Sequence, residues 1–154
     1  MSQKPYRLGA IAYVLNEDDQ LLLVQLNSYK KNEWNMPGGG REGDEGASQN
    51  ATRELKEELG IVDEELELIG ISKNPLKYDF PAEMEQRGEP IALKYAGQKK
   101  DQVVLKCDLA RELEIDGNEI HDYKWCTIDE LEGHLMFPGQ YDDAIAVLKE
   151  FNFI

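Results

Sequence analysis

The stretch Gly39–Ile61 places a glycine-rich loop directly before a segment with a strong helical pattern. Its apolar residues recur every fourth position, which predicts a stripe that faces the protein core: Ala51, Leu55 and Leu59. Gly60 follows at the position where helices favour a glycine. The pattern therefore predicts a helix that begins at about residue 45 or 47 and ends at Leu59.

A second face of this helix carries three carboxylates, Glu54, Glu57 and Glu58. Residues three and four apart are neighbours on a helix, and like charges at that spacing cost roughly 0.2–0.5 kcal/mol per pair. These carboxylates also stand toward the C-terminal end of the helix, where its dipole disfavours anions. Three glutamates placed against these costs, next to a flexible glycine loop, indicate a site for a hard cation with oxygen ligands.

These residues reproduce a known spaced motif at every defined position: Gly39, Glu45, Arg53, Glu54, Leu55, Glu57, Glu58, Gly60 and Ile61. The motif is the Nudix box, and residues 39–61 are identified as a match to it. A solvated acidic helix face would account for each carboxylate singly. It would not account for their combination with the glycines and Arg53, so the chain resembles the Nudix hydrolase family.

The resemblance implies an α/β fold in which helices sandwich a mixed central sheet, with residues 1–154 forming one domain. The segment patterns agree with that fold class. We expect strands over 8–15, 20–26, 65–73, 91–95, 102–109 and 119–126, the last at a sheet edge. The residues around Gly38–Gly40 are expected to interrupt regular structure, and residues 96–101 to form a loop. Residues 127–130 have the form of a capping box for a short helix, and 141–151 predict a C-terminal amphipathic helix.

The resemblance also implies the chemistry, which is hydrolysis of a nucleoside diphosphate linked to another group by attack of water on phosphorus. It implies Mg²⁺ as cofactor, with Mn²⁺ as an alternative, held by the Gly38 carbonyl, Glu54, Glu57 and Glu58. Arg53 would hold a glutamate in place, and Glu45 would be structural. The general base would be a box glutamate or a later carboxylate, which makes Glu54, Glu57 and Arg53 the expected catalytic residues.

Downstream residues resemble one subgroup, the bacterial RNA 5′-pyrophosphohydrolases and dinucleoside polyphosphate hydrolases. Tyr78 lies seventeen residues after Ile61, and Glu119 precedes Trp125 by six. Further similar segments are Tyr6–Arg7, 34–37, 76–81 and 97–99. By this resemblance Glu119 would be an additional metal ligand. Contacts to substrate would come from Arg7, Trp34, Tyr78 and Lys99.

Each of these downstream residues also has a simpler explanation. Tyr78 and Trp34 would serve as packing aromatics, Glu119 as an exposed strand residue, and Arg7 and Lys99 as surface charges. The loop Pro37–Gly40 also departs from the Pro-Gln-Gly-Gly of the subgroup toward the enzymes that cleave free nucleoside triphosphates. Two alternatives therefore stay open: a sanitising hydrolase of free or oxidised nucleoside triphosphates, and a catalytically silent nucleotide-binding module.

The charge balance limits the partners. The formal net charge of −14 excludes a large duplex-binding groove, because duplex binders present a basic face. Residues 73–106 are an exception, with seven Lys or Arg against five Asp or Glu, and provide a place to receive an anion. No apolar run approaches the ~20 residues of a membrane helix. Cys107 and Cys126 lie in apolar segments, which predicts buried reduced thiols and a cytoplasmic protein, as monomer or homodimer.

Overall fold

A computed structural model describes residues 4–109, 111–135 and 137–154. The strands are β1 (Tyr6–Leu15), β2 (Leu21–Leu26), β3 (Gly38–Gly40), β4 (Leu66–Ile71), β5 (Leu76–Asp79), β6 (Gly97–Cys107) and β7 (Ile120–Cys126). The α-helices are α1 (Ala47–Leu59), α2 (Ala82–Gln86), α3 (Pro90–Lys94) and α4 (Gln140–Glu150), and the 3-10 helices are η1 (Asp63–Glu65) and η2 (Ile128–Gly133).

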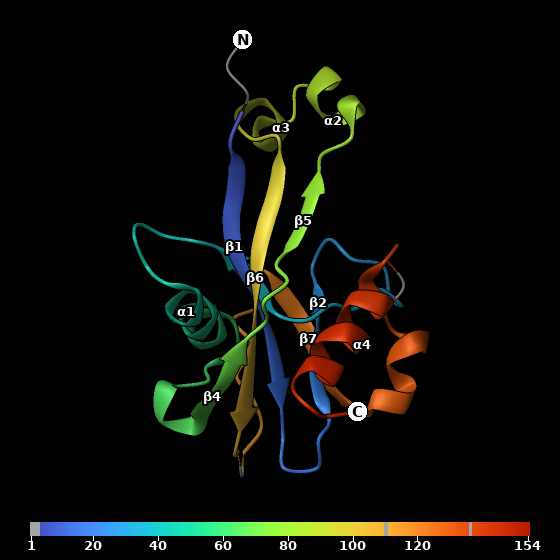
Figure 1. Ribbon diagram of the computed structural model, residues 1–154. Coiled ribbons are helices and arrows are strands. Elements are labelled where there is room, and N and C mark those ends of the chain that lie inside the picture. Colours follow the sequence, from blue (N-terminus) through green and yellow to red (C-terminus); the bar gives the residue numbers. More distant parts are fainter. Residues whose placement is uncertain (1–3, 110, 136) are drawn as a thin grey trace.

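The described strands form one mixed sheet in the order β4-β6-β1-β2-β7, with β3 paired to β1 and β5 paired to β6. Parallel pairing joins β1 to β6, and the other pairs are antiparallel. Helix α1 covers one face of the sheet, while α4 and η2 cover the other (Figure 1). This α/β/α arrangement is the expected fold class, and β7 lies at the expected sheet edge.

Strand β1 runs through the middle of the sheet and is buried on both faces from Gly9 to Leu15. Its residues alternate: Ala10, Ala12 and Val14 join the core beneath α1, whereas Ile11, Tyr13 and Leu15 join the core beneath α4. The strand therefore reads as a continuous apolar run rather than as alternating polar and apolar residues. Because β3 pairs with the first half of this strand, the glycine loop is fixed directly to the centre of the sheet.

The structure corrects three expectations about local structure. Residues 91–94 belong to helix α3 rather than to a strand, because Pro90 stands in its first turn, where proline favours a helix. Residues Gly97–Asp101 belong to β6 rather than to a loop, since they pair with β1 on one side and with β5 on the other. Gly38–Gly40 form the short strand β3, which long-range pairing with β1 stabilises.

The expected helices are confirmed with small shifts. Helix α1 ends at Leu59, and Gly60 adopts the left-handed conformation with φ 68°. The capping box at Thr127 and Glu130 is present, but the element that follows is a 3-10 helix. In α4 the buried residues are Ala144, Val147 and Leu148, and Phe151, which follows the helix, packs against the same core. The two cysteines are free and buried, as expected.

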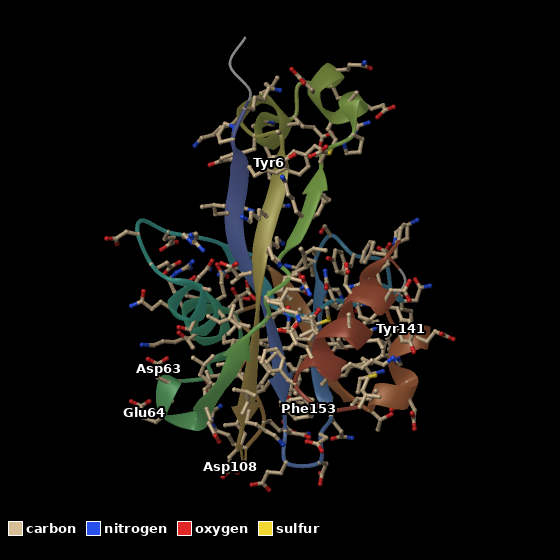
Figure 2. All side chains as sticks on the ribbon, viewed as in Figure 1. Tyr6, Asp63, Glu64, Asp108, Tyr141 and Phe153 are labelled. Atoms are coloured by element: carbon tan, nitrogen blue, oxygen red, sulfur yellow. The ribbon has the colours of Figure 1, made fainter. Side chains whose placement is uncertain are left out.

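Strands β1, β5 and β6 extend together beyond the helical layers (Figure 1). Tyr6 lies in this extension, and its ring is labelled at that end in Figure 2. Tyr6, Gly97 and Asp79 are neighbours across the three strands, and the Tyr6 hydroxyl donates a hydrogen bond to the Asp79 carboxylate. Because Gly97 has no side chain between them, this bond ties β5 to β1 across β6.

Candidate active site

Helix α1 carries two parallel stripes that both face the sheet. One is the apolar stripe expected from the sequence, and the other is polar, with Asn50, Glu54 and Glu58 buried at four-residue intervals. The Asn50 side-chain amide donates to the Gly39 and Gly40 carbonyls at 3.4 and 3.2 Å. A side chain at Gly39 would overlap the Glu54 carboxylate, so Gly39 must be a glycine for Glu54 to lie against β3.

Arg53 organises the outer side of this helix. Its guanidinium donates from Nε and Nη2 to the Glu45 carboxylate and from Nη2 to the Gly40 carbonyl at 2.7 Å. Its Nη1 lies 3.1 Å from Glu54 Oε1 and 3.2 Å from Glu57 Oε2. Arg53 in turn lowers the pKa of the Glu45 carboxyl. Arg53 therefore joins Glu45, Glu54 and Glu57, while its catalytic role and the structural role of Glu45 stay predictions.

Three carboxyl groups meet at the inner side of α1. Glu54 and Glu58 are close to each other, and Glu119, which directly precedes β7, lies within hydrogen-bonding reach of Glu58. Glu58 is only 3% exposed. Burial, followed by the neighbouring Glu54 and Glu119 carboxyls, raises the pKa of Glu58, and burial also raises the pKa of Glu54. The tertiary fold thus brings together residues that are more than sixty positions apart in the chain.

The donor set at this cluster fits a divalent cation. Glu58 Oε2 is buried and has no hydrogen-bond partner in the structure. An unpartnered carboxylate oxygen among two further carboxyls is costly unless a proton or a cation lies beside it. Within the described residues, however, no three acidic, histidine or cysteine side chains already surround one point as ligands. Glu57 turns outward to Arg53 and is 55% exposed, so its approach to the cluster requires a side-chain rearrangement.

On the opposite face of the sheet, a chain of hydrogen bonds joins three strands. Arg7 Nη1 donates to Gln98 Oε1 at 3.3 Å, and Gln98 Nε2 donates to the Tyr78 hydroxyl at 2.7 Å. The strand register places these three residues side by side on β1, β6 and β5. Arg7 and Tyr78, which the sequence predicts as substrate contacts, are therefore linked, and Gln98 is the link that sequence reasoning did not assign.

Comparison with known proteins identifies the family. The family model described as NUDIX domain matches residues 5–148 of this chain. The chain belongs to the NUDIX family. It is 33% identical over 154 residues to an RNA pyrophosphohydrolase of Zymomonas mobilis, covering 97% of this chain and 91% of that protein. The expected assignment to the Nudix hydrolases, as enzymes that cleave phosphoanhydrides, is thereby confirmed.

Solved Nudix structures share the fold. An Ap4A hydrolase of C. elegans, solved as a binary complex, matches with a TM-score of 0.64 at 20% identity, covering 94% of this chain and 96% of that chain. A bifunctional NMN adenylyltransferase/ADP ribose pyrophosphatase of Francisella tularensis, complexed with AMP and a Mn ion, matches with a TM-score of 0.64 at 22% identity. That match covers 98% of this chain and 43% of the other. Nudix hydrolases use a divalent cation such as Mg²⁺ or Mn²⁺.

The other predicted site residues of this Nudix hydrolase, Gly38, Trp34 and Lys99, lie in three separate places. Gly38 lies in β3 opposite Ile11, one residue before the glycine that touches Glu54. Trp34 packs edge-on against His134 and beneath the Lys124 ammonium. Lys99 is exposed, and its register places it on the face of β6 opposite to Gln98. The substrate-binding roles of Trp34 and Lys99 stay predictions.

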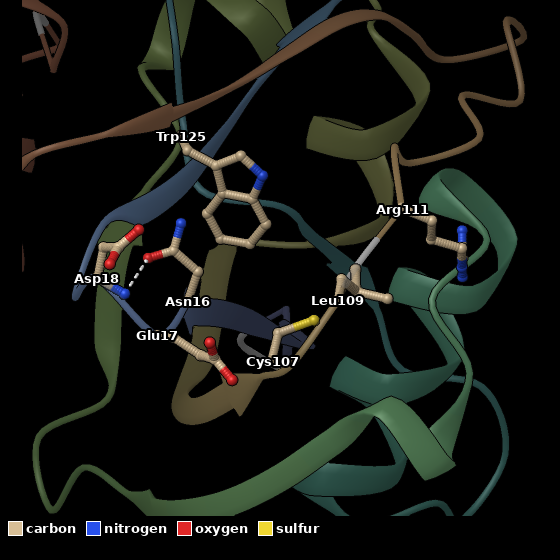
Figure 3. A pocket seen from close by; sticks show the side chains of 7 residues that line it. All are labelled: Asn16, Glu17, Asp18, Cys107, Leu109, Arg111 and Trp125. Carbon is tan, nitrogen blue, oxygen red and sulfur yellow. Dashed lines mark hydrogen bonds between the residues drawn. The ribbon is translucent and has the colours of Figure 1, made fainter.

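A cavity of about 130 Å³ lies at the β1–β2 turn, and none of the predicted site residues lines it (Figure 3). Its lining includes Asn16, Cys107 and Trp125. Arg111 borders it, but its guanidinium is held by the Glu65 carboxylate and the Gly60 carbonyl. Because Asn16 follows the last residue of β1 whereas Arg7 is near its first, the cavity lies at the other end of the central strand from the candidate active site.

Two residues of the site were absent from the sequence-based set: Asn50 and Gln98. Asn50 had a detectable signal, since it continues the i, i+4 series of Glu54 and Glu58 toward the N-terminus of the helix. Gln98 lies in segment 97–99, which resembles the subgroup, but its place beside Arg7 had no local signal, because residues 96–101 read as a loop. The structure also contains no helix, among its described residues, that is long and apolar enough to cross a bilayer.

Proposed function

We propose that this chain is a Mg²⁺-dependent pyrophosphohydrolase that acts on 5′-triphosphorylated RNA ends. The observation that carries the proposal is the buried pair Glu54 and Glu58, with the exposed Glu119 beside Glu58 and an unpartnered Glu58 oxygen, inside a complete Nudix box. The substrate class is supported by the similarity to the Zymomonas RNA pyrophosphohydrolase over nearly the whole chain. Dinucleoside polyphosphates are the second candidate, since they present the same phosphoanhydride chain.

The metal would be held by Glu54, Glu57, Glu58, Glu119 and the Gly38 carbonyl. When bound, Mg²⁺ would neutralise phosphate oxygens and acidify an attacking water. Arg53, itself held by Glu45 and Gly40, orients Glu54 and Glu57 through one shared nitrogen. One of these two carboxylates accepts the proton of the attacking water. Arg7 and Tyr78 contact the 5′ end of the substrate, and Gln98 links these two side chains through hydrogen bonds.

This recognition is local, and it is compatible with a strongly acidic protein. A 5′-terminal triphosphate and one or two nucleotides need only a few contacts, whereas a long RNA would be repelled by a net charge of −14. Locally, Lys100 lies two residues after Gln98 on the same face of β6, next to Arg7, so this face is basic. We therefore place substrate discrimination at the terminal phosphates rather than along an RNA backbone groove.

Product analysis with Mg²⁺ tests the substrate class. The panel contains a short triphosphorylated RNA, diadenosine tetraphosphate, a nucleoside triphosphate and an oxidised guanine triphosphate. We expect phosphate or pyrophosphate to be released from the RNA with kcat/KM well above that for the free nucleotides. Preferred cleavage of one small nucleotide would overturn the RNA assignment and leave a housekeeping hydrolase.

Glu57→Gln tests whether the box is catalytic. We expect kcat to fall by about 10²-fold or more with the fold intact, because charge stabilisation at the reacting phosphate is lost. Exposed Glu64 in η1, replaced by Gln, is the matched control and should keep wild-type turnover. Unchanged turnover in Glu57→Gln would contradict the metal-site assignment. Absence of turnover by the parent protein on the whole panel would instead favour a silent nucleotide-binding module.

A further inference from the structure

Two cations lie next to each other on the face of the sheet that carries Tyr78 and Gln98. Arg7 in β1 is opposite Gln98 in β6, and Gly9 is opposite Lys100. Residues two apart in a strand point to the same face, so Lys100 lies beside Arg7 and Gln98. Their proximity has an electrostatic consequence: burial, followed by the positive charge of Arg7, lowers the pKa of Lys100.

Neither cation has a carboxylate partner in the described part of the chain. The hydrogen bond of Arg7 goes to the neutral Gln98 amide. Lys100 forms no hydrogen bond or salt bridge with a described residue, although Glu54 and Glu58 weakly favour its charged form. In a protein with 31 Asp and Glu against 17 Lys and Arg, two adjacent unpartnered cations are unfavourable unless an anion joins them.

The backbone below these cations is free of side chains. Gly9 and Gly40 are paired in the β1–β3 ladder, and a side chain at Gly40 would overlap the Arg7 guanidinium. Arg7 therefore lies directly on the glycine backbone, and the strand neighbour of Lys100 is Gly9. A ligand bound on this glycine backbone would be next to β3. On the other face of β3, the central Gly39 lies against Glu54.

We propose that Arg7 and Lys100 together bind one phosphate group of the substrate's polyphosphate chain, as a two-cation clamp. This phosphate group is a different one from the group that lies at the carboxylate cluster. Lys100, rather than the sequence-predicted Lys99, supplies the second charge, because Lys99 projects from the opposite face of β6. Gln98 is a positioning residue that holds Arg7 and the Tyr78 hydroxyl through its amide. This inference rests on the proposed function only in taking the ligand to be a polyphosphate.

Binding of tripolyphosphate in the presence of EDTA tests the clamp without metal or turnover. Isothermal titration calorimetry compares wild type with Lys100→Gln, Lys100→Arg and the matched neighbour Lys99→Gln. We expect Lys100→Gln to weaken binding by about tenfold or more, since a hydrogen-bonded charge contact is lost. The loss in Lys99→Gln should be clearly smaller than that in Lys100→Gln, because Lys99 projects from the other face of β6, and Lys100→Arg should retain most of the affinity. Equal losses at Lys99 and Lys100, wild-type binding by Lys100→Gln, or no binding by wild type would each overturn the proposal.

Thermal unfolding in the same buffers checks that the variants fold. Removing Lys100 also removes its repulsion with Arg7, so Lys100→Gln should unfold at no lower temperature than wild type when no anion is present. Its melting temperature should no longer rise on addition of tripolyphosphate. Failure of the proposed function is distinguishable: a protein that binds tripolyphosphate through Lys100 but hydrolyses no triphosphorylated RNA keeps the clamp and loses the substrate assignment.

Discussion

At the scale of single residues, Glu58 shows that the candidate metal site lowers the stability of the metal-free fold. Its carboxyl group is buried among two other carboxyls, and its Oε2 atom has no hydrogen-bond partner. Such a group opposes folding in the absence of a cation, and it becomes favourable when a cation binds. Stability and metal affinity are therefore opposed at this residue.

Replacing Glu58 by Gln should raise the free energy of unfolding in EDTA by about 1–3 kcal/mol, because a buried amide is neutral without having to take up a proton, whereas the Glu58 carboxyl is not. The same variant should lose most of the stabilisation that Mg²⁺ confers on wild type. Chemical denaturation with and without Mg²⁺ measures both effects, with Glu64→Gln as the exposed control. A metal-free Glu58→Gln protein that is less stable than wild type would refute this account.

At the scale of elements, the contact between α1 and β3 sets the position of the carboxylates. Asn50 holds the Gly39 and Gly40 carbonyls, Arg53 holds the Gly40 carbonyl, and Gly39 leaves room for Glu54. The helix and the glycine strand therefore act as one unit. The precision of the site depends on this packing as much as on the ligands.

Gly39→Ala should displace Glu54, because the added methyl group would overlap its carboxylate. We expect a fall in kcat of about 10²-fold, the size that a misplacement of about 1 Å produces. The stability loss should be about 1–3 kcal/mol, as for other overpacked sites. Gly133→Ala is the control, since a methyl group there meets open space. Steady-state kinetics and thermal unfolding that fail to separate the two variants would contradict the packing argument.

Helix α4 is attached to the end of β4 by a second element-scale contact. The Glu150 carboxylate accepts hydrogen bonds from Ser72 Oγ at 2.6 Å and from the Lys73 amide at 3.0 Å. The Ser72 hydroxyl, followed by the Lys73 amide, lowers the pKa of the Glu150 carboxyl below that of an unfolded chain. The contact is consequently a source of pH-dependent stability.

A carboxyl with a lowered folded-state pKa stabilises the protein above the unfolded pKa, and this contribution is lost as pH falls through the folded-state pKa. Glu150→Gln should therefore unfold at a lower temperature than wild type at neutral pH. The difference should shrink as the pH falls below the normal pKa range of glutamate. Melting temperatures across pH measure this, with exposed Glu132→Gln as control. A difference independent of pH would contradict a role for the Glu150 charge.

At the scale of the whole molecule, the acidic surface and the small basic face act together. The chain repels long polyanions through its net charge of −14, while Arg7 and Lys100 offer a local site for one phosphate group. Selectivity for a terminal phosphate group would then arise because the acidic surface repels the rest of an RNA, while Arg7 and Lys100 attract its terminal phosphate. The salt dependence of RNA binding measures how many phosphates are neutralised.

Binding of a triphosphorylated RNA to the Glu57→Gln variant should depend only weakly on salt. Each neutralised phosphate of a single strand contributes about −0.7 to the slope of log K against log salt, so two cations predict a slope of about −1.4. The same RNA with a 5′-hydroxyl should bind far more weakly. Fluorescence anisotropy at several salt concentrations gives the slope, and a value steeper than about −4 would indicate an extended backbone groove instead.

Much of the fold, and the acidic helix with its glycine loop, followed from local spacing in the sequence. The apolar and acidic stripes of α1, the left-handed Gly60 and the central strands were predicted because helix and strand periods depend on neighbouring residues. Residues 91–101 were misread for a physical reason. The strand Gly97–Asp101 is stabilised by pairing with β1 and β5, and such long-range pairing leaves little local signal.

The sequence by itself determined the family, the acidic helix and the glycines that adjoin it, because all of these depend on spacing within one short stretch. Only the tertiary structure decided that Glu119 meets Glu58 and that Lys100, rather than Lys99, lies beside Arg7. Successive residues of a strand point to opposite faces, so one position of register decides which lysine shares a face with Arg7. That register is set by pairing with strands distant in the chain.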